Sequence, residues 1–246
     1  MSFIESIKKT GTKINLYKLN KDVLEKQIHG TTLFSNAMNI CFIDLETTGL
    51  NKEEDKIIEI ALKTVKIDKA EGNIISFDDK YESFQDPGIE IEEKISLITG
   101  ITDSMVTGYE INWEKVNEIV NNTDIMIAHN ARFDRAFLDR NMPLSKDKVW
   151  ACSVSDIDWL HRGFAKSSLE LLSTWHGFYY ESHRAMNDVD ALIHLLTHPS
   201  YKETKPVTEL INNSQIPYYE VIASNSPYET KDILRSYNYR WNGENK

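Results

Sequence analysis

The acids Asp44 and Glu46 are the first feature of this 246-residue sequence that could carry out chemistry. They lie in the segment NICFIDLE (39–46), which reads as a strand, and side chains two residues apart on a strand share one face. The following segment, TTG, reads as a turn, so the pair would stand at a strand end, where open α/β sheets bind ligands. Two interpretations stay open here: a solvated acidic edge and a metal site.

Two further acids occupy inward-facing positions of predicted helices. Asp134 shares a stripe with large apolar residues of the helix expected over 131–141, and Asp188 does the same in the helix expected over 187–198. A carboxylate on a buried face is costly unless it is paired, although an acid in the first turn can also serve the helix dipole. We expect the neighbouring Asp190 to be a solvated acid that points elsewhere.

The four acids Asp44, Glu46, Asp134 and Asp188 would repel one another strongly if they converged in a partly buried site. Two divalent cations would neutralise all four charges, and a ligand set made only of oxygen suits Mg²⁺ or Mn²⁺ better than zinc. Two such ions about 3.5–4 Å apart would clamp the attacking and leaving oxygens of a phosphoryl displacement.

Among the histidines, His183 precedes Asp188 by five residues and could take a proton from an attacking water molecule. His129 lies at a predicted strand end near Asp134 and could line the same cleft. The remaining histidines are expected mostly at the surface; they are His29, His161, His176, His194 and His198.

The elements that must position these residues alternate along the chain. Strands are predicted over 39–46, 56–67, 73–84, 124–130 and 148–156. Helices are predicted over 95–101, 113–122, 131–141, 167–177 and 187–198. Three early strands followed by alternating strands and helices predict an α/β domain with a mixed sheet.

The flanking segments differ from this central domain, which we place at 38–200. Residues 1–37 are polar, carry six lysines and read as a short N-terminal extension. Residues 201–246 read as a small, aromatic-rich C-terminal α+β module. In that module we predict a strand over 218–224, a helix over 228–237 opened by a capping box, and a final strand over 239–241.

Composition excludes several classes of protein. The net charge is −10, with 16 basic and 29 acidic residues in 38–200, which argues against coating nucleic acid by charge alone. No run approaches the roughly 20 apolar residues that a membrane helix needs, and the N-terminus has no apolar stretch typical of a secretory signal. Cys41 and Cys152 lack zinc-ligand spacing and are expected to be buried, reduced thiols of a cytoplasmic protein.

Three motifs resemble those of the DEDDh 3′–5′ exonucleases, a family that includes the proofreading subunit of bacterial DNA polymerase III, ribonuclease T and oligoribonuclease. The motifs are FIDLETTGL (42–50), AHNARFD (128–134) and HRAMNDVDAL (183–192). The resemblance covers roughly 39–198 and implies a ribonuclease H-like, five-stranded mixed sheet flanked by helices. It identifies 38–200 as the exonuclease domain and has no counterpart for the two flanking segments.

The resemblance also implies roles for individual residues. Asp44, Glu46 and Asp188 would hold the tighter of two Mg²⁺ or Mn²⁺ ions, with Asp44 bridging to the second. Asp134 would support the second ion through water, and His183 would be the general base.

The same resemblance implies a set of substrate contacts. The backbone around Thr47 and the side chain of Leu50 would position the terminal nucleotide, and Asn130 and Phe133 would shape the cleft behind it. Ser153 departs from the pattern, since many members carry Thr there.

We therefore expect in-line attack of water on the terminal phosphodiester of a single-stranded 3′ end, with release of nucleoside 5′-monophosphates. A DNA exonuclease is the favoured function. An RNA-trimming or short-oligonucleotide exoribonuclease is the alternative, and a non-catalytic partner-binding domain is the third candidate. The expected partner is a polymerase or another nucleic-acid-handling protein, and no association with a membrane is expected. The C-terminal module either packs on itself or helps to bind the strand through its aromatics and the residues Lys231, Arg235, Arg240 and Trp241.

Overall fold

The computed structural model describes residues 8–10, 13–28, 36–217 and 221–240. The chain divides into two compact units, Met1–Gln215 and Ile216–Lys246. The first unit therefore runs past the boundary predicted after residue 200. Within the described ranges no helix is long and apolar enough to cross a membrane.

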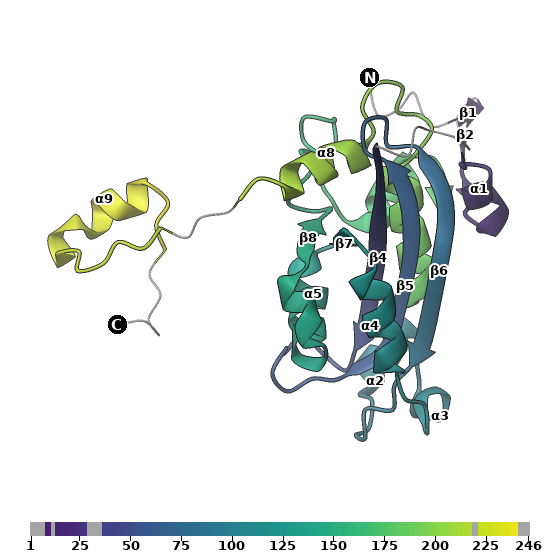
Figure 1. Ribbon diagram of the computed structural model, residues 1–246, viewed down its shortest axis with the longest axis horizontal. Coiled ribbons are helices and arrows are strands. Elements are labelled where there is room, and N and C mark those ends of the chain that lie inside the picture. Colours follow the sequence, from purple (N-terminus) through teal and green to yellow (C-terminus); the bar gives the residue numbers. More distant parts are fainter. Residues whose placement is uncertain (1–7, 11–12, 29–35, 218–220, 241–246) are drawn as a thin grey trace. The chain divides into compact units, whose positions relative to one another are not determined.

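A five-stranded mixed sheet forms the centre of the first unit (Figure 1), as the sequence predicts. In spatial order its strands are β6 (Ile74–Phe84), β5 (Ile57–Asp68), β4 (Ala37–Thr47), β7 (Ile125–Ala128) and β8 (Val149–Cys152). The three long strands pair antiparallel, while β7 runs parallel to both β4 and β8. The predicted strand over 148–156 ends earlier because Asp156 turns back and accepts a hydrogen bond from the Cys152 backbone N–H at 2.8 Å.

Side-chain alternation along β4 divides the core into two layers. Ile40 and Phe42 pack in one cluster with residues of α6 (Leu169–Trp175), α7 (Ala185–Leu196) and α8 (Pro206–Ser214). Cys41 and Ile43 point the other way, into a cluster with residues of α4 (Trp113–Asn121) and α5 (Ala131–Asn141). The sheet is therefore covered by helices on both faces.

Shorter elements pack beside the start of β5. The helices α2 (Glu93–Thr99) and α3 (Asp103–Val106) follow β6 and pack around the buried Ile58. The predicted helix over 95–101 stops at Thr99 because Gly100 adopts the left-handed conformation, φ 70°, of a helix C-cap. A 3₁₀ turn, η3 (Pro143–Asp147), connects α5 to β8.

From residue 17 onward, the described part of the N-terminal extension packs against the rest of the first unit. β1 (Lys8–Thr10) and β2 (Lys13–Asn15) form a hairpin. β3 (Tyr17–Lys18) pairs in parallel with β9 (Phe178–Tyr179). The helix α1 (Lys21–Glu25) then buries Leu24 in the core.

Three histidines expected at the surface are buried, so that prediction is wrong for His176, His194 and His198. Each ring finds polar partners inside the fold: the Tyr17 hydroxyl lies 2.6 Å from His194 Nε2 and 3.0 Å from His198 Nε2. Burial lowers the pKa of His194 to about 4, which keeps the ring neutral. His161 is exposed as expected, and His29 lies outside the described residues.

Two further expectations need correction. Asp190 is not a solvated acid, because its carboxylate pairs with Lys63 Nζ at 2.8 Å where both side chains are largely covered. Cys152 is only half-buried, whereas Cys41 is buried as predicted, and both are free thiols.

In the second unit, the predicted helix over 228–237 is present as the turn η4 (Tyr228–Thr230) followed by α9 (Lys231–Ser236). Residues 221–224 and 239–240 are not in strands; the rest of the two predicted strands, including Trp241, lies outside the described residues. Lys231 Nζ lies 4.1 Å from the centroid of the Tyr228 ring, so this cation packs locally.

Candidate active site

The acids Asp44 and Glu46 lie where β4 runs beyond its neighbour β7. The pairing of β4 with β7 ends at Phe42, so the rest of β4 has no strand partner on that side. The two carboxylates project from the same face of β4, the face on which α7 packs. This end of the sheet therefore opens into a cavity.

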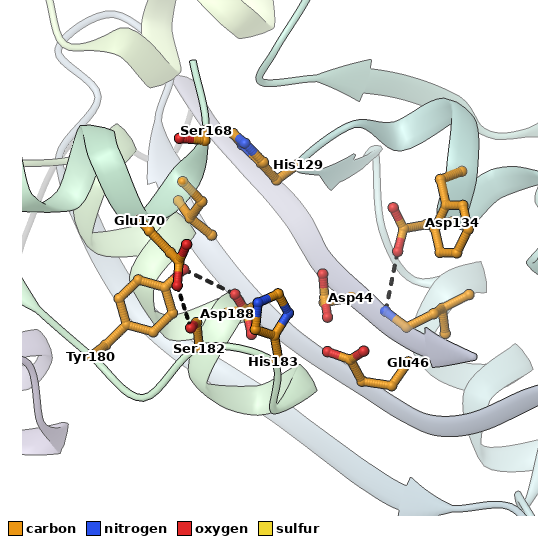
Figure 2. A pocket seen from close by; sticks show the side chains of 13 residues that line it. Asp44, Glu46, His129, Asp134, Ser168, Glu170, Tyr180, Ser182, His183 and Asp188 are labelled. Atoms are coloured by element: carbon orange, nitrogen blue, oxygen red, sulfur yellow. Dashed lines mark hydrogen bonds between the residues drawn. The ribbon is translucent and has the colours of Figure 1, made fainter. Parts of the chain in front are cut away.

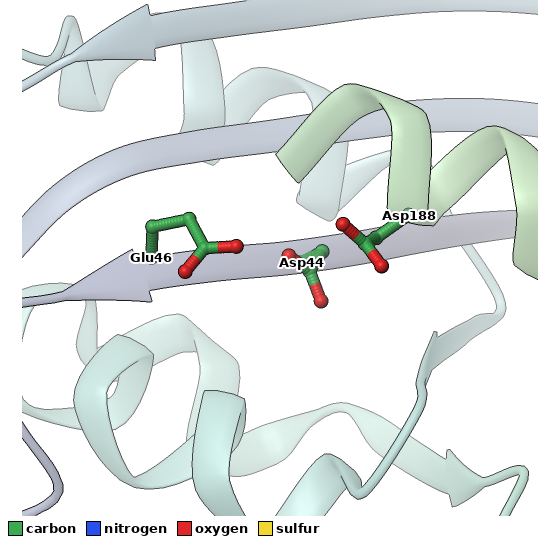
Figure 3. A group of neighbouring side chains, drawn as sticks. All are labelled: Asp44, Glu46 and Asp188. Atoms are coloured by element: carbon green, nitrogen blue, oxygen red, sulfur yellow. The ribbon is translucent and has the colours of Figure 1, made fainter. Parts of the chain in front are cut away.

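Asp188 reaches the same place from the first turn of α7 (Figure 3). One ligand oxygen from each of Asp44, Glu46 and Asp188 lies within 4.8 Å of the other two, and all three side chains are half-buried. They line a cavity of about 290 Å³ that we call the acidic cavity; its acids are Asp44, Glu46, Asp134, Glu170 and Asp188.

The proximity of these acids shows in their pKa values. Burial, followed by the charges of Asp134 and Asp188, raises the pKa of Asp44 well above its ordinary value. Burial and the charge of Asp188 raise the pKa of Glu46 to about 8. Repulsion of this kind is relieved by bound divalent cations, and an oxygen-only donor set fits Mg²⁺ or Mn²⁺.

Asp134 lines the acidic cavity but stands apart from the group of three. It is 2% exposed, and its Oδ1 accepts a hydrogen bond at 3.1 Å from the Leu45 backbone N–H, beyond the last residue that pairs with β7 (Figure 2). Burial raises the pKa of Asp134 to about 8. The structure thus brings Asp134 beside β4 without making it part of the three-carboxylate group.

His183 lies beside Asp188 on the loop before α7 and is exposed to solvent at the mouth of the acidic cavity. Its backbone adopts the left-handed region, φ 61°, which is uncommon for a residue other than glycine and recurs at functional sites. Burial raises the pKa of Asp188 to about 6, while a hydrogen bond from Tyr180 and the charge of His183 act in the opposite direction.

The residues expected to contact substrate occupy different places. His129 and Phe133 line the acidic cavity, and His129 Nδ1 lies 2.8 Å from Ser153 Oγ. Leu50 and Asn130 line a neighbouring cavity, which Phe133 also borders. Thr47 lines neither cavity; its side chain is turned inward and donates to the Gly49 carbonyl at 2.6 Å.

Two groups that sequence reasoning missed hold the site together. The Tyr180 hydroxyl donates to Asp188 Oδ1 at 2.9 Å, next to the short β3–β9 pairing. Glu59 on β5 accepts from Arg184 at 2.9 Å and from the Ala185 backbone N–H at 2.9 Å. Glu59 thereby fixes the start of α7 to the sheet. No spacing signal marks Tyr180, whereas the inward-facing Glu59 lies in a run of isoleucines and could have been noticed.

Comparison with known proteins identifies relatives of this arrangement. A family profile described as "Exonuclease" matches residues 41–196. The PolC-type DNA polymerase III of Clostridium perfringens is 34% identical over 170 residues, which are 66% of this chain and 11% of that protein. The PolC-type enzyme of Thermotoga petrophila is 34% identical over 165 residues, 64% of this chain and again 11% of the relative. The chain thus spans about a tenth of the length of these relatives.

Solved structures support the fold. Exonuclease X in complex with 5′-overhanging duplex DNA aligns with a TM-score of 0.51 at 23% identity, covering 71% of this chain and 99% of that one. A zinc-bound complex of E. coli exonuclease I with single-stranded DNA aligns with a TM-score of 0.52 at 18% identity, covering 65% and 40%. The predicted ribonuclease H-like fold is confirmed by the sheet order and by these neighbours.

Proposed function

Because this chain belongs to the DEDDh-type 3′–5′ exonuclease family, we propose that it removes nucleoside 5′-monophosphates from the 3′ end of single-stranded DNA. The observation that carries the proposal is the group of Asp44, Glu46 and Asp188, whose ligand oxygens lie within 4.8 Å of one another. It is supported by Asp134 and His183, which line the same cavity.

In this proposal Asp44, Glu46 and Asp188 would hold two divalent ions, Mg²⁺ or Mn²⁺, and Asp134 would support the second of them. When bound, such ions would supply positive charge to the carboxylates and to the phosphate oxygens of an in-line displacement. His183 is exposed at the mouth of the cavity, where its ring can accept the proton of the attacking water.

Contacts to the terminal nucleotide are assigned to residues that line the acidic cavity, to residues of the cavity beside it, and to the nearby Thr47. We propose that the backbone around Thr47 and the Leu50 side chain position the nucleotide. His129, Asn130 and Phe133 shape the walls of the cleft behind it. These contacts need no base recognition, because an exonuclease must accept each nucleotide in turn.

DNA is the favoured substrate because the similar curated proteins are DNA polymerases and two structural neighbours were solved with DNA. An exoribonuclease is the second candidate, since the three motifs also occur in RNA-trimming members of the family. Association with a polymerase is proposed on the same resemblance, and a cytoplasmic location on the two free thiols.

The test is digestion of 5′-labelled single-stranded oligonucleotides with Mn²⁺ or Mg²⁺ present. The wild-type protein should shorten the labelled strand one nucleotide at a time, whereas Asp44→Ala and His183→Ala should not. Glu114→Ala removes an exposed acid of α4 and serves as the control. Undiminished digestion by both site variants would refute the proposal, and matched DNA and RNA strands decide between the two substrates.

A further inference from the structure

A second cavity of about 210 Å³ adjoins the acidic cavity, and Phe133 lines both. We call it the basic cavity, because Lys52 and Arg132 line it and no acid among the described residues does. Leu50 and Asn130 also line the basic cavity. The two cavities thus meet at one aromatic ring and carry opposite charges.

The two cations of the basic cavity are available to an incoming anion. Both Lys52 and Arg132 are exposed, and neither forms an ion pair with another described residue. Lys63 and Arg162, by contrast, are held at short distance by Asp190 and Glu209. In a chain of net charge −10, two free cations facing one cavity favour a ligand that carries negative charge.

The loop that presents Leu50 and Lys52 is held firmly. Arg140 of α5 donates to the Lys52 and Asp55 carbonyls, each at 2.5 Å. The Asp55 carboxylate turns back and accepts from the Asn51 backbone N–H at 2.7 Å. These bonds keep Lys52 at the rim of the basic cavity.

Gly49 allows that loop to close. A Cβ atom added at Gly49 would lie 2.4 Å from Asp55 Oδ2, so a larger residue would push the carboxylate out of place. The closed loop leaves the Leu50 side chain 86% exposed on the wall of the basic cavity. An exposed leucine beside two free cations matches a ligand with an apolar face and a phosphate.

We propose that the basic cavity binds the nucleotide next to the terminal one, with Lys52 and Arg132 on its phosphate and Leu50 and Phe133 against its sugar and base. The inference rests on the proposed function, in which the terminal nucleotide occupies the acidic cavity. Attraction of the strand at this cavity offsets the repulsion that the carboxylates exert on a polyanion.

The test compares the double variant Lys52→Ala/Arg132→Ala with the wild-type protein on two substrates. One is a 5′-labelled single-stranded oligothymidylate, and the other is the p-nitrophenyl ester of thymidine 5′-monophosphate, which has no second nucleotide. For the oligonucleotide, KM should rise roughly tenfold or more with kcat retained. For the ester, both constants should stay at wild-type values.

Salt dependence gives a second readout that misfolding does not imitate. The slope of log KM against log salt concentration for the oligonucleotide should fall by about 1.4, since each of two lost phosphate contacts contributes about 0.7 on a single strand. The control variant Lys69→Ala/Lys202→Ala removes two exposed lysines elsewhere and should keep the wild-type slope.

Three outcomes would overturn the inference. An unchanged oligonucleotide KM and salt slope would show that the cations do not contact the strand. An equal rise in KM for the ester would place the two cations on the terminal nucleotide instead. A matching rise in KM for the Lys69→Ala/Lys202→Ala control would show that the effect comes from the net charge of the protein. If the wild-type protein hydrolyses neither substrate, the proposed function fails instead, and that result is separate from all three.

Discussion

The acidic and basic cavities share the Phe133 ring yet have opposite charge, and they differ in how their charged groups are held. Four carboxylates of the acidic cavity are half-buried or buried and raise one another's pKa values; they belong to Asp44, Glu46, Asp134 and Asp188. The cations of the basic cavity are exposed on a hydrogen-bonded loop and the start of a helix. The contrast teaches that the carboxylates alone repel a polyanion, and that the proposed attraction for the strand comes from the cations beside them.

The largest expected effect comes from removing one charge of the acidic cavity. Asp188→Asn should lower exonuclease activity by about 10³-fold, on the order of 4 kcal/mol of transition-state stabilisation, because one of the three grouped carboxylates is lost. Mn²⁺ binding measured by calorimetry should weaken in parallel. The assignment of different roles to the two cavities would be wrong if Asp188→Asn behaved like Lys52→Ala/Arg132→Ala, with normal Mn²⁺ binding and a change in KM alone.

The next effect separates proton transfer from ion binding inside the acidic cavity. His183→Ala should lower kcat by about 10²–10³-fold, within the range of about 10²–10⁴ that a general base contributes. Because the ring is exposed and outside the group of three carboxylates, Mn²⁺ affinity should change little. Steady-state kinetics and calorimetry on the same preparation check both parts; a large loss of Mn²⁺ affinity would instead make His183 an ion ligand.

A smaller effect is expected from the hydroxyl that orients Asp188. Tyr180→Phe removes the 2.9 Å hydrogen bond to Asp188 Oδ1 while keeping the ring, and should weaken Mn²⁺ binding by roughly 10–100-fold. Tyr179→Phe removes the hydroxyl of the neighbouring, exposed tyrosine, which does not bond to Asp188, and is the matched control. Equal Mn²⁺ affinity in the wild type and Tyr180→Phe would limit Tyr180 to a packing role.

The smallest effect concerns stability of the metal-free protein. The pKa of Glu46 is raised to about 8, so the folded state binds its proton more tightly than the unfolded state, and stability is lost as pH rises from about 4 to about 8. Without metal at pH 8, the free energy of unfolding of Glu46→Gln should therefore exceed that of the wild type by about 1–2 kcal/mol. This difference corresponds to an unfolding temperature that is higher by roughly 2–8 °C. The two proteins should coincide near pH 4.

Calorimetric unfolding at both pH values measures this difference. Added Mn²⁺ should stabilise the wild type more at pH 8 than at pH 5, because protons compete with the ion for the same oxygens. A wild type that is the more stable protein at pH 8 without metal would contradict the charge crowding on which the comparison rests.

Much of the acidic cavity was predictable from local periodicity. Alternation on β4 places Asp44 and Glu46 on one face, and the helical stripe turns Asp188 inward, so both follow from the spacing of residues close in sequence. The basic cavity was not predictable in this way. Lys52 lies in a loop whose course is set by hydrogen bonds from Arg140, 88 positions further along the chain.

The remaining misses have the same origin in distant contacts. Tyr180 is held near β9 by pairing with the N-terminal β3, which no local pattern announces. The buried His194 and His198 depend on Tyr17 for their polar partner. Helix α8 is different, since Pro206, Val207 and Leu210 have a helical pattern that is local in sequence, yet the predicted C-terminal module of 201–246 includes no helix there.

The most direct test of the central claim is the anomalous scattering of Mn²⁺ in crystals soaked with a nucleoside 5′-monophosphate. We expect manganese peaks about 2.0–2.2 Å from carboxylate oxygens of Asp44, Glu46 and Asp188, with the phosphate beside them. A well-ordered, folded protein that shows no manganese at these three carboxylates would contradict the account.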